Sequence, residues 1–281
     1  MEAKTTIKSV PPYQEFARFY DRVMGNAVAP LIERSFEQSR RRYGIRFASA
    51  ADIGCGTGRL LLYLSRHCNV LYGVDSSAEM LAEARHRTGH NNIQFLRQDL
   101  RELRLPRPVD LITCTFDTLN YLTTPNQLKQ ALQRIRDNLR DGGHVVFDLI
   151  TGAGERGRRR LIRQHVRLPD ADATWLVAID GHKSLSCVKM QWTSRGKDGR
   201  LRRWREVHLQ RWYPMRWLCA LLDWCGLSVR GIHNAVSYEP ASARTWWAHF
   251  VACKLPQGAR RTSSGSLRGL SNDDQIRKHR G

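Results

Sequence analysis

The stretch ADIGCGTGRLLLYLSRHCNVLYGVD, residues 51–75, decides the fold expected for this chain. A short apolar strand pattern runs into three glycines at alternate positions, Gly54, Gly56 and Gly58. An apolar helical run follows, and a second strand pattern ends at Asp75. Glycines after a strand let the backbone pass close to a ligand, with a helix N-terminus behind them. The stretch therefore predicts a binding loop for a nucleotide-like ligand.

Two further features narrow the class of ligand. Asp75 follows Gly54 by about 20 residues, and an acid at that spacing can accept hydrogen bonds from both hydroxyls of a ribose. A dinucleotide fingerprint needs its third glycine one place after Gly58, and that place holds Arg59. The loop thus departs from the NAD pattern but keeps an acid suited to a ribose.

The flanking sequence alternates between strand and helix patterns. Strand patterns cover residues 47–54, 70–75, 93–99, 109–116 and 144–150, and helix patterns cover 60–67, 78–87 and 123–139. Thr124 can cap the last helix and Pro125 suits its first turn. Strands that alternate with helices predict an α/β fold, with a doubly wound, mostly parallel sheet and helices on both faces.

The chain divides into segments of different character. Apolar residues recur at helical spacing between positions 16 and 23, which predicts an N-terminal helical cap over residues 1–45. Residues 46–150 are expected to form the Rossmann-like core. Strand patterns joined by turns then predict an inserted antiparallel β lid at residues 151–213. We expect a helix and closing strands of the core at 214–255, and a disordered basic tail at 256–281.

Composition bears on the cellular compartment and on metal and membrane partners. Seven cysteines without a CxxC pair, in a chain without an apolar signal-peptide core, indicate reduced thiols and a cytoplasmic protein. No two short Cys/His pairs stand at zinc spacing, so no metal is expected. No apolar run is long enough to cross a membrane, so no membrane partner is expected.

The net charge of +20 points to anionic partners. Such a field attracts phosphates, nucleic acid or acidic membrane surfaces. The other interpretation is an arginine-rich solvated surface, since charge alone locates no groove. A nucleic-acid partner therefore stays open beside a small-molecule one.

These motifs resemble the class I S-adenosylmethionine-dependent methyltransferases over roughly residues 13–254. DIGCGTG is similar to the first motif of that family, GVDSSAEML to the second, and RQDL to the segment that holds the adenine. TFDTLNYL and DGGHVVFDL resemble a small-molecule subgroup of the methyltransferase domain 25 or 11 type. That subgroup has a Tyr-Asp-x-x-Met element, seen here at residues 20–24, and a Glu-x-His-x-Gln-Arg-x-Tyr stretch, seen here at 206–213.

The resemblance implies a Rossmann-like fold, with S-adenosyl-L-methionine as the cofactor. Asp52 and the glycine loop would face its methionine end, Asp75 its ribose, and Asp99 with the Leu100 backbone its adenine. Met80 would pack on the adenine, while Tyr20 would close over the cofactor. The implied cofactor-binding residues are Tyr20, Asp52, Gly54, Cys55, Gly56, Gly58, Asp75, Ser76, Met80, Asp99, Leu100 and Phe116.

The candidate catalytic residues are His208, Glu206 and Asp117. Glu206, His208 and Gln210 share one strand face, because side chains alternate along a strand. That face is either the acceptor pocket or solvated surface. His208 is the leading candidate for a general base because histidine titrates near neutrality. The resemblance places Asp117, with Phe116, at the mouth where the methyl group meets the acceptor, and Asn120 and Tyr121 are alternative acceptor contacts.

The expected function is methyl transfer to a nitrogen or oxygen of a small molecule. The chain lacks the Asn-Pro-Pro-Tyr pattern of enzymes that methylate exocyclic amines of bases, which disfavours that subclass. The tryptophans of the insert and its flank either stack on RNA bases or form a packed sheet; they are Trp192, Trp204, Trp212 and Trp217. An RNA-directed methyltransferase is thus the second hypothesis, and a non-catalytic binding protein is the third.

Overall fold

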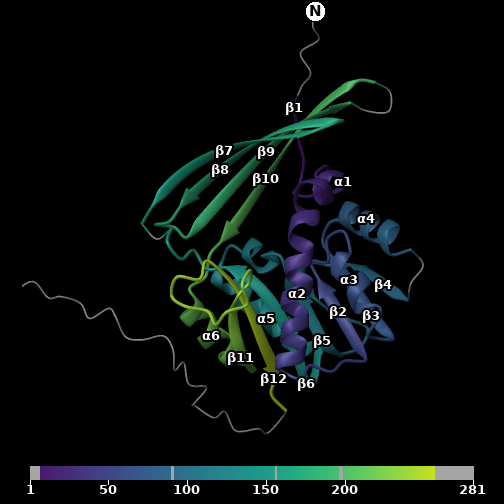
Figure 1. Cartoon of the computed structure of the whole chain (residues 1–281), viewed down its shortest axis with the longest axis vertical. Coiled ribbons are helices and arrows are strands. Elements are labelled where there is room, and N and C mark those ends of the chain that lie inside the picture. Colours follow the sequence, from purple (N-terminus) through teal and green to yellow (C-terminus); the bar gives the residue numbers. More distant parts are fainter. Residues whose placement is uncertain (1–6, 90–91, 156, 196–198, 257–281) are drawn as a thin grey trace, which may run out of the picture.

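The structure is a computed structural model that describes residues 7–89, 92–155, 157–195 and 199–256 (Figure 1). The tail expected to be disordered, residues 256–281, lies outside these ranges except for Pro256. Two sheets build the described chain: a seven-stranded central sheet and a five-stranded inserted sheet that projects beyond one end of it.

The central sheet is mostly parallel and has the strand order β11-β12-β6-β5-β2-β3-β4. Its strands are β2 (Ser49–Ile53), β3 (Val70–Asp75), β4 (Ile93–Arg97), β5 (Val109–Cys114), β6 (Leu139–Ile150), β11 (Leu227–Asn234) and β12 (Trp247–Lys254). Neighbouring strands among β2 to β6 are parallel, whereas β12 is antiparallel to both β6 and β11. Strand β2 is buried at every position, as expected for a strand covered on both faces.

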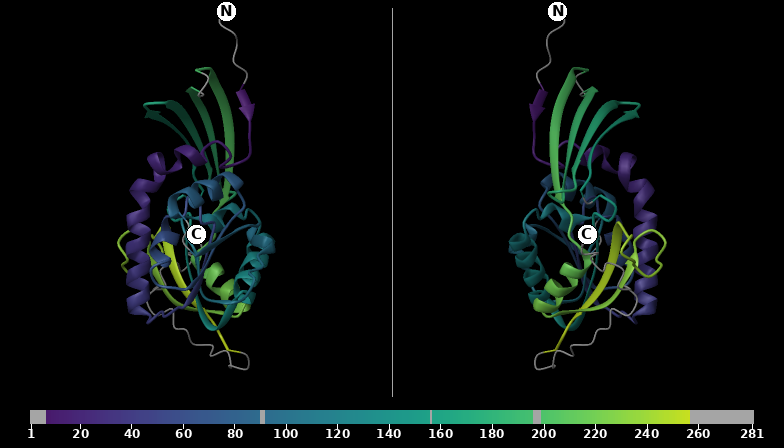
Figure 2. Two further views of the ribbon diagram at one scale, coloured as in Figure 1. Left: turned by 90° about the vertical axis from the view of Figure 1, so that its right-hand side faces the viewer. Right: turned by 90° about the vertical axis from the view of Figure 1, so that its left-hand side faces the viewer.

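Helices cover both faces of this sheet (Figure 2). One face carries α2 (Asn26–Arg42), α3 (Arg59–Leu64) and α4 (Ala78–Thr88), and the other carries α5 (Pro125–Asp137) and α6 (Met215–Trp224). The expected cap of α5 forms, since Thr124 Oγ1 accepts a hydrogen bond from the backbone N–H of Gln127. The prediction of a doubly wound α/β fold is confirmed.

The inserted sheet has the strand order β1-β10-β9-β8-β7. Its strands are β1 (Ile7–Ser9), β7 (Arg159–Leu168), β8 (Ala171–Asp180), β9 (Leu185–Arg195) and β10 (Leu201–Arg211). Strands β7 to β10 form an antiparallel meander, and β1 joins β10 in parallel. The sequence patterns indicated β8, β9 and β10 but not β1 or β7. Both are edge strands, and the arginines along β7 obscure the apolar alternation that marks a strand.

The N-terminal segment packs its aromatic residues against the inner face of the inserted sheet. Short helices α1 (Ala17–Tyr20) and η1 (Asp21–Gly25) lead from this contact into α2. The ring of Trp192 stacks on Phe16 and Phe19, with centroid distances of 5.3 and 4.9 Å. Trp192 is 1% exposed and Trp204 is 3% exposed. A role for these two tryptophans in stacking on RNA bases is therefore wrong, and they form the core of the insert.

Two further findings concern membranes and thiols. Within the described ranges no helix has both the length and the apolar character that a membrane crossing needs. All seven cysteines lie in described segments and are free thiols.

Candidate functional site

Two adjoining cavities lie at the carboxyl ends of the parallel strands, the edge at which open α/β sheets bind ligands. The main cavity has a volume of about 520 Å³ and the side cavity about 70 Å³. They share Tyr20, Gly54, Gly56 and Phe116 as lining residues. The residues expected at the cofactor that line one or both cavities are Tyr20, Asp52, Gly54, Cys55, Gly56, Asp75, Ser76, Met80, Asp99, Leu100 and Phe116.

Gly56 and Gly58 have different roles in the loop. All three loop glycines have positive φ values, which residues with a Cβ rarely adopt. A Cβ on Gly56 would meet nothing within 4 Å, so the backbone there faces open space. A Cβ on Gly58 would lie 3.0 Å from the Cβ of Ala84, and Gly58 lines neither cavity. Gly58 thus allows α3 and α4 to approach each other, whereas Gly56 opens the loop to a ligand.

Asp75 ends β3 and holds the glycine loop. Its carboxylate accepts hydrogen bonds from the backbone N–H groups of Gly56 and Ser77, each at 2.9 Å. Burial raises the pKa of Asp75, and the hydrogen bonds from Ser77 and Gly56 oppose that shift. Two carboxylate oxygens have more acceptor capacity than two N–H groups use, so Asp75 can also accept from a ligand hydroxyl.

Asp52 lies deeper, next to the side cavity. The residue is 3% exposed, and its carboxylate accepts a hydrogen bond of 2.7 Å from Thr113 Oγ1. Burial raises the pKa of Asp52 to about 7, and the charge on Asp75 adds to this shift. Near neutral pH this position therefore carries a partial negative charge that a nearby cation would increase.

The far end of the main cavity is formed after β4. Asp99 caps the short helix η2 (Leu100–Glu102) through the Arg101 N–H and forms an ion pair with the Arg101 side chain. That side-chain contact lowers the pKa of Asp99, so this carboxylate is ionised near neutral pH. Met80 of α4 is 2% exposed and also lines the cavity, so it belongs to both the core and the site wall.

Four aromatic rings gather where the two cavities meet the inserted sheet. The rings of Tyr13 and Tyr20 lie 6.0 Å apart, those of Tyr20 and Phe116 also 6.0 Å, and those of Tyr13 and Tyr121 5.8 Å. All four side chains line the main cavity. Tyr13 was not among the residues expected at the site, because it lies outside the motifs and its backbone makes no regular element.

Phe116 and Asp117 follow β5 in a strained conformation. Both are non-glycine residues with left-handed backbone, at φ values of 60° and 50°. The buried carboxylate of Asp148 holds them, since it accepts hydrogen bonds from both of their N–H groups and from Trp247 Nε1. Sequence reasoning missed Asp148, because its position inside β6 suggests an ordinary core strand.

Asp117 carries its carboxylate next to the inserted sheet and, unlike the adjacent Phe116, lines neither cavity. Gln210 Nε2 donates a hydrogen bond to Asp117 Oδ2. Loss of hydration raises the pKa of Asp117 to about 7, the charge on Asp148 adds to the shift, and the Gln210 hydrogen bond opposes it. A carboxylate with this pKa can exchange a proton near neutral pH.

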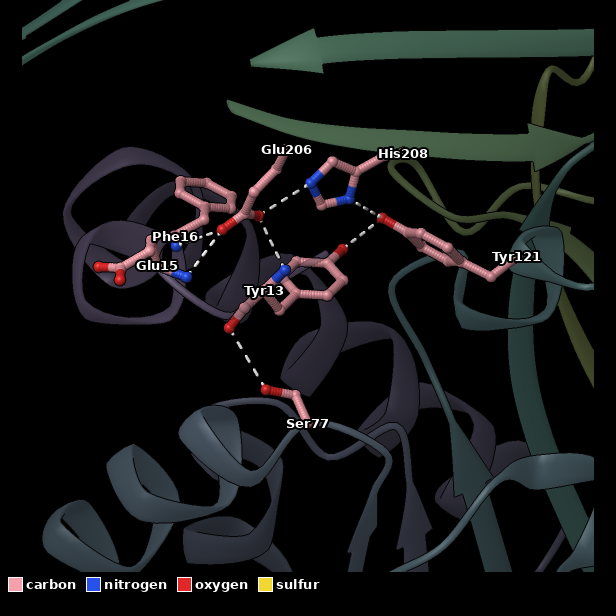
Figure 3. Close-up of polar contacts among 7 residues, drawn as sticks. All are labelled: Tyr13, Glu15, Phe16, Ser77, Tyr121, Glu206 and His208. Carbon is pink, nitrogen blue, oxygen red and sulfur yellow. Dashed lines mark hydrogen bonds and ion pairs between the residues drawn. The ribbon is translucent and has the colours of Figure 1, made fainter. Parts of the chain in front are cut away.

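Glu206 and His208 are buried beneath the N-terminal segment (Figure 3). Glu206 is 0% exposed and His208 is 2% exposed, so the possibility that this strand face is solvated surface is wrong at these two residues. Neither of them lines either of the two cavities. His208 Nε2 lies 3.2 Å from Glu206 Oε2, and His208 Nδ1 lies 2.9 Å from the Tyr121 hydroxyl oxygen. The Tyr121 hydroxyl in turn lies 2.5 Å from that of Tyr13. A buried hydrogen-bonded chain thus connects the inserted sheet to the cavity wall.

Two other residues join parts of the site. Asp21 accepts hydrogen bonds from Thr57 Oγ1 and from the side chains of Arg59 and Arg87, which ties η1 to the glycine loop. Asn120, in helix η3 (Thr118–Tyr121), bonds only to backbone among the described residues, through the N–H and C=O of Ile150 and the C=O of Arg211. Of the two alternative acceptor contacts, only Tyr121 lines the main cavity.

Comparison with known sequences identifies the family of the core. The model of the family described as "Methyltransferase domain" matches residues 50–143. A putative methyltransferase of Geobacillus sp. (strain WCH70) is 32% identical over 140 residues, which cover 49% of this chain and 57% of that protein. The dTDP-3-amino-3,6-dideoxy-alpha-D-glucopyranose N,N-dimethyltransferase of Streptomyces fradiae is 32% identical over 108 residues, 38% of this chain and 42% of that one. The chain spans about half the length of the curated relatives it matches.

Solved structures resemble a larger part of the chain. An S-adenosylmethionine-dependent methyltransferase from Clostridium acetobutylicum aligns with a TM-score of 0.75 at 22% identity, covering 87% of this chain and 99% of that one. The sugar N-methyltransferase KedS8 from Streptoalloteichus aligns with a TM-score of 0.66 at 21% identity, covering 91% and 96%. These likenesses extend over the inserted sheet and show a shared fold.

Proposed function

We propose that this chain, whose residues 50–143 match the family described as "Methyltransferase domain", transfers a methyl group from S-adenosyl-L-methionine to an amine nitrogen of a small molecule. The observation that carries the proposal is the meeting of the glycine loop, the ribose-type acid Asp75 and an aromatic ring cluster in one cavity. An ammonium group favours aromatic faces and nearby carboxylates. The rings of Tyr20 and Phe116 lie where the cavities join, Asp52 lines the side cavity and Asp75 the main one.

The residues present fit the cofactor. Gly56 faces open space at the cavity wall, so a ligand can contact its backbone directly. Asp75 would accept from the ribose, Asp99 would hold the adenine edge, and Met80 would pack on the adenine plane. The cofactor, when bound, supplies an electrophilic methyl group next to a positively charged sulfur. The partly charged Asp52 and the rings of Tyr20 and Phe116 would stabilise that charge.

The acceptor end supports an amine over a hydroxyl. An amine arrives mostly as an ammonium ion at neutral pH and must lose a proton before its lone pair can react. Asp117, directly after the cavity-lining Phe116 and with a pKa raised to about 7, is the group we propose to take that proton. Tyr13, Tyr20 and Tyr121 would orient the nitrogen, and their hydroxyls stay neutral because burial raises the pKa of each.

The names of several similar proteins favour the same nitrogen chemistry. Two of the curated relatives are N,N-dimethyltransferases of amino sugars carried on dTDP, and one of the similar structures is a sugar N-methyltransferase. We therefore propose an amino sugar, or a molecule with a similarly placed amine, as the first substrate class to test.

A methyl-transfer screen tests this function. Purified protein is incubated with labelled S-adenosylmethionine and panels of amino sugars, nucleotide-linked amino sugars, phenols and RNA. Methylation confined to amines, and lost in Asp117→Asn with cofactor binding retained, supports the proposal. Transfer to phenols or RNA alone rejects the amine. Cofactor binding without any methyl transfer favours the hypothesis of a non-catalytic binding protein.

A nucleic-acid partner is the second candidate, because the outer face of the inserted sheet is basic. Exposed basic side chains on this face, opposite to the buried tryptophans, are Arg163, Arg167, Lys189, Arg203 and Arg205. Phosphate contacts by such residues give an affinity that falls steeply with salt concentration. RNA affinity that persists at physiological salt and is lost after charge reversal of Arg203 and Arg205 would favour this candidate.

A further inference from the structure

Glu206 has an unusual set of partners for a buried carboxylate. No lysine or arginine among the described residues forms an ion pair with it; His208 is its partner at 3.2 Å. Instead, three backbone N–H groups donate to it, each at 2.8 Å: that of Tyr13 to Oε2, and those of Glu15 and Phe16 to Oε1 (Figure 3). An ionised carboxylate removed from water is costly unless such hydrogen bonds compensate it. Apart from His208, the hydrogen-bond partners of the Glu206 carboxylate among the described residues all belong to the N-terminal segment.

The N-terminal segment follows β10 to reach this carboxylate. Strand β1 pairs in parallel with β10, from Ile7 opposite Arg203 to Ser9 opposite Arg205. The Val10 N–H then donates to the Arg205 carbonyl at 3.0 Å. Residues 11–16, which we call the strap, follow Val10. The backbone N–H groups near the end of the strap bond to the Glu206 carboxylate. Pro11, Pro12, Tyr13 and Gln14 of the strap line the main cavity, so its roof comes from the N-terminus of the chain.

The strap is strained at Tyr13. This non-glycine residue has a φ of 63°, a left-handed conformation that persists only where surrounding contacts impose it. Its N–H is held by Glu206, its carbonyl accepts from Ser77 Oγ at 3.3 Å, and its hydroxyl contacts that of Tyr121. Loss of the Glu206 contacts would release three N–H groups at once and let the Tyr13 backbone relax.

We propose that Glu206 is a positioning residue that assembles the cavity roof by holding the strap, and that it does not act as a base. His208 adds to this anchoring, because it connects Glu206 to the Tyr121 hydroxyl and so to Tyr13. The inserted sheet thereby acts on the site through the N-terminal segment. The effect on catalysis rests on the proposed function, whereas the anchoring of the strap does not.

Hydrogen exchange of the cofactor-free protein tests the anchoring directly. In the wild type, the amides of Tyr13, Glu15 and Phe16 should exchange as slowly as amides of a sheet. In Glu206→Gln one acceptor oxygen becomes an NH₂ group, so the amides that bonded to that oxygen should lose protection while β9 and β10 keep theirs. Rapid exchange of the three amides in the wild type would overturn the proposal, even if the variant does not fold. The matched control is Glu239→Gln, at an exposed glutamate outside the site.

Kinetics separate positioning from base catalysis. If the strap forms the roof, Glu206→Gln should raise the KM for the acceptor and the Kd for the cofactor about tenfold or more. These effects should shrink in a Tyr13→Ala background, because the side chain being positioned is absent. A fall in kcat alone, with amide protection, KM and Kd unchanged, would show that Glu206 acts as a base. Protected amides in a protein that does not bind S-adenosylmethionine would reject the proposed function and leave the anchoring intact.

Discussion

Replacing Asp75 with alanine should weaken cofactor binding far more than it weakens the fold. In the variant the ribose hydroxyls would lack their acceptor. The Gly56 N–H, 2.9 Å from the Asp75 carboxylate in the wild type, would lack its acceptor too. A hydrogen bond to a charged group contributes about 1.5–3 kcal/mol. One such bond to the ribose corresponds to a Kd that is higher by roughly 10- to 150-fold. A looser glycine loop acts in the same direction.

Titration calorimetry with S-adenosylmethionine and S-adenosylhomocysteine measures this change. Asp110→Ala is the matched control, because Asp110 also accepts two backbone N–H bonds, from Ala48 and Ser49, but lies near the opposite end of the strands. That variant should lose stability and keep the wild-type Kd. The reasoning is refuted if Asp75→Ala, shown to be folded by circular dichroism, binds as the wild type does, or if both variants lose affinity equally.

Other variants test the remaining parts of the site. Methyl transfer should increase with pH through about 7, where Asp117 ionises, and Asp117→Asn should flatten that profile and lower kcat by about 100-fold in rate assays. Folding raises the pKa of Asp52 from 3.8 to about 7, so the folded state binds this proton more tightly than the unfolded state does. The stability that this gives is lost as pH rises through about 7. Urea denaturation should therefore show Asp52→Asn gaining up to about 4 kcal/mol relative to the wild type between pH 4 and 7. Gly56→Ala, at a φ of 52°, should cost about 1–2 kcal/mol in denaturation and more than tenfold in cofactor affinity by calorimetry. Trp192→Ala should destabilise the protein by about 3–5 kcal/mol in denaturant, since this side chain is almost fully buried between Phe16 and Phe19.

Local physics explains why so much of the core could be predicted. The glycines of the loop, the strand ending at Asp75 and the cap at Thr124 each depend on residues close in sequence. Hydrophobic periodicity likewise reports a helix or strand from one short window, and alternation of the two implies a parallel sheet. The sequence by itself therefore determined the fold class, and all but Gly58 of the twelve residues expected at the cofactor line the two cavities at the carboxyl ends of the strands.

The acceptor side depended on contacts that no local pattern encodes. Glu206 bonds to Tyr13 across 193 positions of the chain, and Asp148 holds Phe116 across 32. Whether the face of β10 with Glu206 and His208 was wet or buried was decided by the N-terminal segment that packs over it. A strand's alternation says which side chains share a face, but only the tertiary structure decides what covers that face. The roles of Glu206, Asp148 and Tyr13 were set there, because a carboxylate becomes an anchor only when folding brings N–H groups to it.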